Sequence, residues 1–178
     1  MGMLIIRDEK KGGVMKKIIV MFGVLLLAAV MVRAVETLTD DGSAKAKIIQ
    51  AAILEHQTGA LDFGVLIADT DGGTSTLAAV AAPTASDSGI NRAAGAVSSD
   101  HFVLSNLDTA MTYTVAIPAS ATITKEGGSE TMSVALTKSD ASVTGVASKD
   151  LYVGGTLTVG ANQAPGEYSG TYTMTVTY

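Results

Sequence analysis

Apolar and polar residues alternate in short runs along much of the chain, which is typical of β-strands that bury one face. The last run, "GEYSGTYTMTVTY", places Tyr, Met and Val on one face and Ser and Thr on the other. "MTYTVAIP", "TMSVALT" and "GTLTVG" alternate in the same way. The predicted buried faces of these four strands are Met111, Tyr113, Val115 and Ile117; Met132, Val134 and Leu136; Leu157 and Val159; and Tyr168, Tyr172, Met174, Val176 and Tyr178.

The last run is also the richest aromatic face in a chain with only 4% aromatic residues. Large aromatic side chains supply much of the apolar area that a core buries. We therefore predict that residues 166–178 form a central strand of the core, and we do not expect an edge strand here.

Other segments predict further strands. In "ALDFGVLI", the residues Leu61, Phe63, Val65 and Ile67 would share one face. Four additional strands are predicted. Their apolar residues are Leu77 and Val80 in the first, Phe102 and Leu104 in the second, Ile123 in the third, and Leu151 and Val153 in the fourth.

Gly, Pro and Asp mark the connections between these runs. We predict turns at residues 71–73, 127–128 and 164–166, and a bulge or tight bend at Gly154-Gly155. Residues 82–96 are polar and predict a long loop, which is the best candidate for a flexible or functional loop.

Residues 43–57 fit two patterns. As a strand, the segment would place Ala44, Ala46 and Ile48 on one face, with lysines between them. As a helix, it would carry an apolar stripe that consists of Ile49, Ala52, Ile53 and His56. The segments that follow are β, so we favour the strand, with a bulge at Ile48-Ile49 where the alternation slips.

Short strands separated by turns predict an all-β domain, either a sandwich or a barrel. We expect one β-sandwich domain over residues 44–178, because this length suits a single core. Residues 35–43 are acidic and rich in turn formers, and we expect them to be a flexible N-terminal segment of the mature protein.

Residues 15–34 have the layout of a secretory signal peptide. Two lysines precede an apolar run over residues 18–32, and Val32-Arg33-Ala34 is a small-x-small cleavage pattern. The run is shorter than the roughly 20 apolar residues of a membrane-spanning helix. We predict a signal-peptide helix, cleavage after Ala34, and a secreted, cell-surface or periplasmic protein. An uncleaved anchor or a buried helix is the alternative.

Residues 1–14 are long and mixed in charge for the start of a signal peptide. Residues 11–14 can be encoded by a purine-rich ribosome-binding sequence directly before Met15. We therefore hypothesise that translation begins at Met15 and that residues 1–14 are a mis-called start.

Composition narrows the classes of partner. Residues 35–178 number 144 and carry 6 basic and 15 acidic side chains, a formal charge of −9. Such a charge disfavours nucleic acid and anionic membranes, which select basic faces. The chain has no Cys, which excludes disulfides and a lipid-modified Cys, and we expect no membrane anchor after signal cleavage.

Candidate chemistry is sparse. His56 and His101 are the only histidines, and neither belongs to a recognisable nucleophile or metal motif. "DTDGG", residues 69–73, begins like a calcium loop but lacks the later ligands. We therefore predict that the protein is not an enzyme and has no catalytic, cofactor-binding or metal site.

The ordered motifs "LDFG", "YTVAIP", "YVGGTLTV" and "GEYSGTYTMTVTY" resemble a family of small exported bacterial proteins, domain-of-unknown-function family 4402, over residues 48–178. The resemblance implies an immunoglobulin-like or pilin-like β-sandwich with no known activity and no established functional residues. The "G-x-Y-x-G" ending also looks like that of spore coat U and chaperone-usher pilus subunits. Those proteins usually carry a disulfide, which this chain lacks.

Two functional hypotheses follow. The first is a structural subunit of a surface filament or coat, whose copies associate by strand exchange or sheet-edge pairing. Residues 35–42 would then lead a donor strand with Ala44, Ala46 and Ile48 as its buried side chains. The alternative is a monomeric secreted module that binds a glycan or matrix ligand through residues 82–96.

Overall fold

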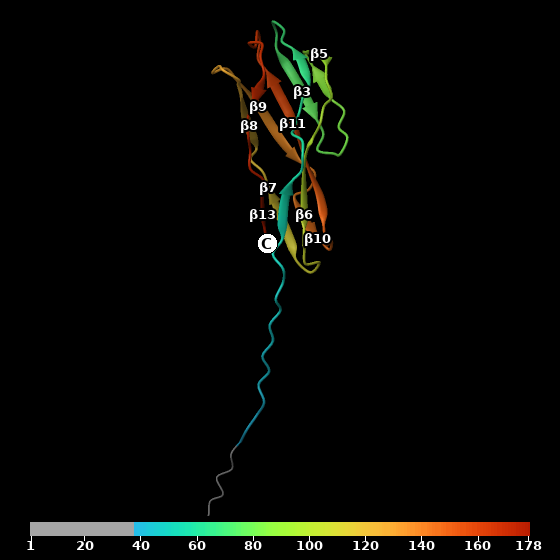
Figure 1. Ribbon diagram of the computed structural model, residues 1–178, viewed down its shortest axis with the longest axis vertical. Helices are drawn as coiled ribbons and strands as arrows, with labels where there is room; N and C mark the ends of the chain where they lie inside the picture. The colour runs from blue at the N-terminus through green and yellow to red at the C-terminus, as the bar shows by residue number, and fades with distance from the viewer. Residues whose placement is uncertain (1–37) are drawn as a thin grey trace, which may run out of the picture. The chain divides into compact units, whose positions relative to one another are not determined.

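The computed structural model describes residues 38–178 (Figure 1). All regular secondary structure in this range is β-strand. The all-β class is therefore confirmed for this part of the chain, which contains no helix that could cross a membrane. The predictions for residues 1–14, 15–34 and 35–37 lie outside the described residues.

The chain divides into two units, residues 1–46 and 47–178. The described part of the first unit, residues 38–46, forms no strand and is exposed. The strands of the second unit are β1 (Ile53–His56), β2 (Val65–Ile67), β3 (Gly73–Leu77), β4 (Ser86–Ser88), β5 (Asn91–Ala94), β6 (Asp100–Ser105), β7 (Thr112–Ala116), β8 (Ser120–Lys125), β9 (Thr131–Lys138), β10 (Ser142–Thr144), β11 (Lys149–Val159), β12 (Tyr168–Ser169) and β13 (Thr175–Thr177).

These strands form three antiparallel sheets. The large sheet has the order β1-β6-β11-β9-β8-β12, and β3 and β4 extend it from β11. The small sheet has the order β10-β7-β13, and β2 pairs with β5 alone. Strands β1 and β13 are therefore end strands of two different sheets.

Two apolar clusters form the core. The first, here called the lower core, lies between the small sheet and the β6 and β11 strands. It consists of Leu104, Leu107, Tyr113, Val115, Val143, Leu151, Val153 and Met174. The second, the upper core, consists of Phe63, Leu77, Ile90, Val134, Leu157 and Val159. Leu136 packs against both clusters. Tyr113, Val115, Val134, Leu157 and Val159 are buried as their alternation predicts.

The long strand β11 links the two clusters. It pairs with β9 along one edge, and along the other edge with β6 up to Val153 and with β3 from Gly155 onwards. The change of neighbour falls at Gly154, where a Cβ atom would lie only 2.3 Å from the Leu77 carbonyl oxygen. The predicted bulge at Gly154-Gly155 is wrong, because the register of β11 with β9 is continuous there.

The C-terminal run alternates as predicted, but it is not one central strand. Its first part, β12, pairs with β8 in the large sheet, and its last part, β13, pairs with β7 in the small sheet. Pro118, between β7 and β8, lies where the neighbouring chain turns from one sheet to the other. Both parts lie at sheet ends, and Tyr178 is exposed. Alternation reports a buried face and does not reveal how many neighbours a strand has.

The predicted common face of "ALDFGVLI" is also wrong. Phe63 is buried, but Val65 and Ile67 are 55% and 50% exposed, whereas Leu66 packs against the upper core. Gly64 adopts a left-handed φ of 68°, and the register with β5 shifts between Val65 and Leu66. This bulge reverses the face that points inward.

Residues 82–96 are not a long loop, because they contain β4 and β5. Arg92 holds this segment: its Nε and Nη2 donate to the two oxygens of Asp87 at 3.0 and 2.8 Å. Arg92 also donates to the buried Ser75 hydroxyl at 2.8 Å and to the Phe63 carbonyl. The hydrogen bonds from Arg92 lower the pKa of the Asp87 carboxyl below its usual value.

In residues 43–57, the strand prediction holds for β1 alone. Residues 43–52 form neither strand nor helix. Ala52 and Leu54 pack against the lower core, so the even-numbered residues here point inward.

A substitution at Gly154 tests whether the close approach of β11 to the backbone of residues 77–79 requires glycine. The Cβ of Gly154→Ala would clash with the backbone of Leu77, Ala78 and Ala79, so we expect a loss of about 1–3 kcal/mol or more in the free energy of unfolding, measured by urea denaturation. Gly160→Ala, which approaches only the flexible Gln163 side chain at 3.1 Å, is the control. Equal stability of the two variants would contradict this account.

Candidate functional site: a seam between β1 and the C-terminal strands

The groups with acid–base chemistry are paired with one another. His101 Nε2 lies 2.8 Å from Asp150, and its ring stacks on Tyr152 with centroids 4.8 Å apart. His56 Nε2 lies 2.5 Å from Asp100 Oδ1. Over residues 38–178, no three His, Cys, Asp or Glu side chains come together in a way that could hold a metal ion.

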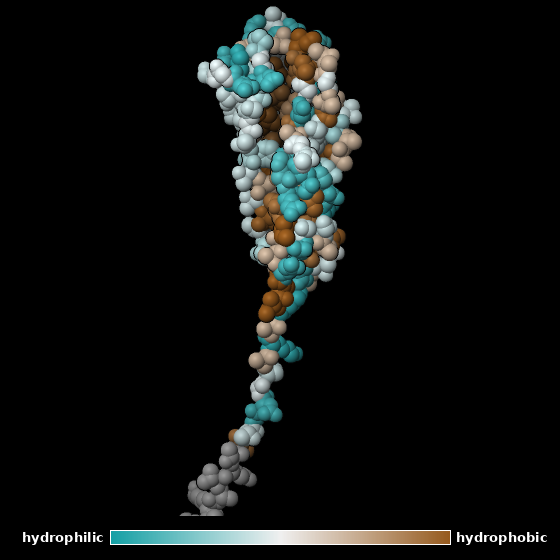
Figure 2. Space-filling view, viewed as in Figure 1, coloured by the Kyte–Doolittle hydropathy of each residue, from teal (hydrophilic) through white to brown (hydrophobic). Residues whose placement is uncertain are grey.

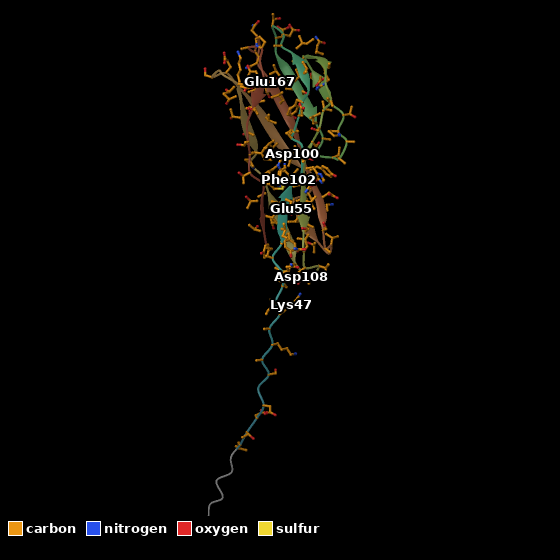
Figure 3. All side chains as sticks on the ribbon, viewed as in Figure 1. Lys47, Glu55, Asp100, Phe102, Asp108 and Glu167 are labelled. Atoms are coloured by element: carbon orange, nitrogen blue, oxygen red, sulfur yellow. The ribbon has the colours of Figure 1, made fainter. Side chains whose placement is uncertain are left out.

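Asp100 is the centre of a buried polar cluster. Asp100 is only 5% exposed, and its carboxylate accepts a hydrogen bond from the Tyr172 hydroxyl at 2.5 Å and contacts His56 through its other oxygen. The backbone N–H of His101 also donates to this carboxylate at 3.0 Å. We call His56, Asp100 and Tyr172 the polar clasp. Figure 3 shows Asp100 in the middle of the unit.

The polar clasp joins three parts of the fold. His56 ends β1, Asp100 begins β6, and Tyr172 lies between β12 and β13. Burial and the neighbouring Asp100 carboxylate raise the pKa of the Tyr172 hydroxyl, because both disfavour a phenolate. Tyr172 therefore stays protonated and donates to Asp100. Within residues 38–178, the hydrogen bonds of the cluster tie β1, β6 and the C-terminal segment together.

The polar clasp connects two strand edges that share no backbone ladder within residues 38–178, and we call the region between these edges the seam. One is the outer edge of β1, which has no partner strand among the described residues, and the other is the stretch 170–178, whose last strand β13 ends the small sheet. Residues 170–174 belong to no strand ladder within the described chain. Ala52, Leu54, Tyr172 and Val176 are only partly buried although they pack on the lower core. The seam thus combines unpaired backbone with apolar side chains.

The surface agrees with this description. Figure 2 shows apolar side chains reaching the surface in the lower half of the unit, and others at the bottom of a hollow in its upper half. The opposite end strand of the small sheet is different. In β10, Val143 is 4% exposed, so no partly buried apolar side chain lies at that edge.

An ion pair holds the first residue of the unit, Lys47, against Asp108. Residues 47–50 and 106–108 line a pocket of about 270 Å³. The hydrogen bond from Lys47 lowers the pKa of the Asp108 carboxyl. Figure 3 shows both residues at the lower end of the unit. Ile48 beside them is 95% exposed.

Sequence patterns located only part of this site. The sequence predicts no catalytic, cofactor or metal residue, and neither histidine belongs to a recognisable nucleophile or metal motif. Asp100 and Tyr172 were not connected to His56, because 44 and 116 positions separate them from it along the chain. Their meeting depends on the pairing of β1 with β6 and on the corner at Pro118.

The polar clasp predicts a pH dependence. The folded-state pKa of Tyr172 lies above its unfolded value near 10, so its contribution to stability is present below pH 10 and decreases as the pH rises further. Tyr172→Phe should cost about 1–3 kcal/mol at pH 8, because Asp100 loses a donor. The stability difference between the two proteins should shrink by up to about 1.4 kcal/mol per pH unit above pH 10.

Urea denaturation of both proteins at pH 8 and pH 11 measures this difference. The other tyrosines are common to both proteins, so their titration cancels. The exposed Tyr178→Phe should change stability by less than about 0.5 kcal/mol at pH 8. A stability difference that is constant with pH would contradict the assignment.

None of the curated proteins matches this chain. The profile of a protein family described as a domain of unknown function (DUF4402) matches residues 53–178, from the first residue of β1 to the C-terminal residue of the chain. This range is more than half of the chain and confirms the predicted resemblance, and the protein therefore belongs to the DUF4402 family.

Proposed function

We propose that this protein is an exported structural subunit of a surface filament or coat, and that its copies associate by strand exchange or sheet-edge pairing. The observation that carries the proposal is the seam, where unpaired backbone and partly buried apolar side chains lie together. A free sheet edge of this kind is a template for another strand. The role requires no catalytic group, and the protein is proposed not to be an enzyme.

The proposed domain is an immunoglobulin-like, pilin-like β-sandwich. Its support is the lower core, which lies between antiparallel strands of two sheets. In such a sandwich the inward-facing side chains of both layers fill the core. The predicted signal peptide supports export to the cell surface, the medium or the periplasm.

Exposed apolar residues in the N-terminal segment support association. Leu38 and Ile48 are almost fully exposed. Full burial of such a side chain is worth about 1.5–3 kcal/mol relative to leaving it in water. A neighbouring copy that covered them would recover this free energy, together with backbone hydrogen bonds.

The alternative, a monomeric module that binds a glycan or matrix ligand through residues 82–96, has less support. This segment contains two strands and is tied to the upper half of the unit by Arg92. It contains no aromatic side chain for stacking on a sugar ring.

The test is the size of the exported product of the full-length gene, measured by light scattering over a range of concentrations. We expect multimers whose mass rises with concentration and which dissociate on heating. Deletion of residues 38–48 should reduce association without changing the circular dichroism of the β unit. Changing Asp40 and Asp41 to Asn, which keeps every apolar residue, should leave association intact.

The two assembly modes give different results. Multimers that survive the deletion would assign assembly to edge pairing alone. A protein that is monomeric at every concentration would overturn the proposed function.

A further inference from the structure

We infer that the seam accepts residues 43–49 of a second copy as an added strand beside residues 170–178, with Ala44, Ala46 and Ile48 facing the seam. This inference rests on the proposed function and specifies its partner and its site. Three properties of the molecule lead to it: the face of the donor segment, the edge of the acceptor, and the contrast between the two ends of the small sheet.

The donor segment has an uncovered apolar face. Because side chains alternate along an extended chain, Ala44, Ala46 and Ile48 would share one face of a donor strand. Ile48 is 95% exposed, and Ala44 and Ala46 are exposed. The inward side chains of β1, Ala52 and Leu54, are by contrast packed against the lower core of their own unit. A second copy can therefore cover side chains that this unit leaves in water.

The acceptor edge has backbone N–H and C=O groups that pair with no other strand of the described chain. Residues 170–174 are in no ladder within the described chain, and β13 pairs only on the side of β7. Extended strands rise by about 3.3 Å per residue, so seven donor residues span roughly 23 Å. The stretch 170–178 is longer than this, and it can pair with the whole donor segment.

The side chains at the acceptor edge suit a narrow donor. Tyr172, Met174 and Val176 point toward the lower core, while the threonines between them are exposed. The polar clasp already occupies the seam beside Tyr172. Alanine side chains fit next to such a filled position, and the larger Ile48 can cover the partly buried apolar residues.

A comparison of the two end strands of the small sheet favours β13 over β10 as the acceptor edge. Strands β10 and β13 have three residues each, but the inward side chain of β10, Val143, is already buried. At the β13 end, Val176 remains only partly buried. An added strand would therefore remove apolar surface from water at β13 and remove little at β10.

Cysteine cross-linking tests the site, because the chain has no native Cys. One copy carries Lys45→Cys, on the donor face that points away from the seam, and a second copy carries Thr177→Cys. The control acceptor is Ser142→Cys. Thr177 and Ser142 both pair with Thr114, from opposite sides, so they are matched in height on the sheet and in exposure.

With a short bismaleimide, we expect covalent dimers between Lys45→Cys and Thr177→Cys at a yield at least about tenfold above that with Ser142→Cys. Equal yields, or cross-linking to Ser142→Cys alone, would overturn the inference. If multimers form without the expected cross-link, the inference fails and the proposed function stands. If the protein is monomeric at every concentration, both fail.

A substitution in the donor gives an independent measurement. Ile48→Ser should weaken association about 10- to 100-fold, because an apolar side chain no longer enters the seam. Its 95% exposure means that the fold of the unit should be unaffected. Lys45→Gln, on the opposite face, should change association by less than about threefold. Equal effects of the two substitutions would contradict the assigned face.

Discussion

The backbone hydrogen bonds of β11 hold the large sheet together and connect the two apolar cores. This strand pairs with β6, β3 and β9, and it contributes Leu151 and Val153 to the lower core and Leu157 and Val159 to the upper core. Its two neighbours on one edge meet at Gly154, where the Leu77 carbonyl leaves no room for a Cβ atom. A single residue without a side chain therefore allows one strand to serve two cores.

The seam lies where the large sheet ends at β1 and the small sheet ends at β13. From β11 the large sheet continues through β6 to β1, and no strand of the described residues joins β1 to β13 in the small sheet. The core is consequently closed along one side by side chains and by the polar clasp instead of backbone hydrogen bonds. A buried carboxylate needs such partners, because an unpaired charge in the core is costly. Asp100 thus holds β1 and the C-terminal segment together where the sheets do not.

Local patterns predicted the inward faces of strands that run without interruption. Tyr113 and Val115 in β7, and Val134 in β9, are buried at alternate positions as their spacing requires. The prediction failed where one residue changed the backbone. Gly64, with its left-handed φ, exposes Val65 and Ile67. It also failed for residues 82–96, since the ties from Arg92 to Ser75 and to the Phe63 carbonyl involve residues that are distant in sequence.

Alternation and ordered motifs are local properties of the chain, so they are enough to predict the all-β class, most inward faces and the family. Which strands are neighbours and which edges stay open depends on contacts between residues that are distant in sequence. The C-terminal run shows the difference. Its alternation buries Met174, yet its position at the ends of two sheets depends on the corner at Pro118. The polar clasp depends on the same corner, and its two hydrogen bonds, between residues 44 and 72 positions apart, leave no trace in local spacing.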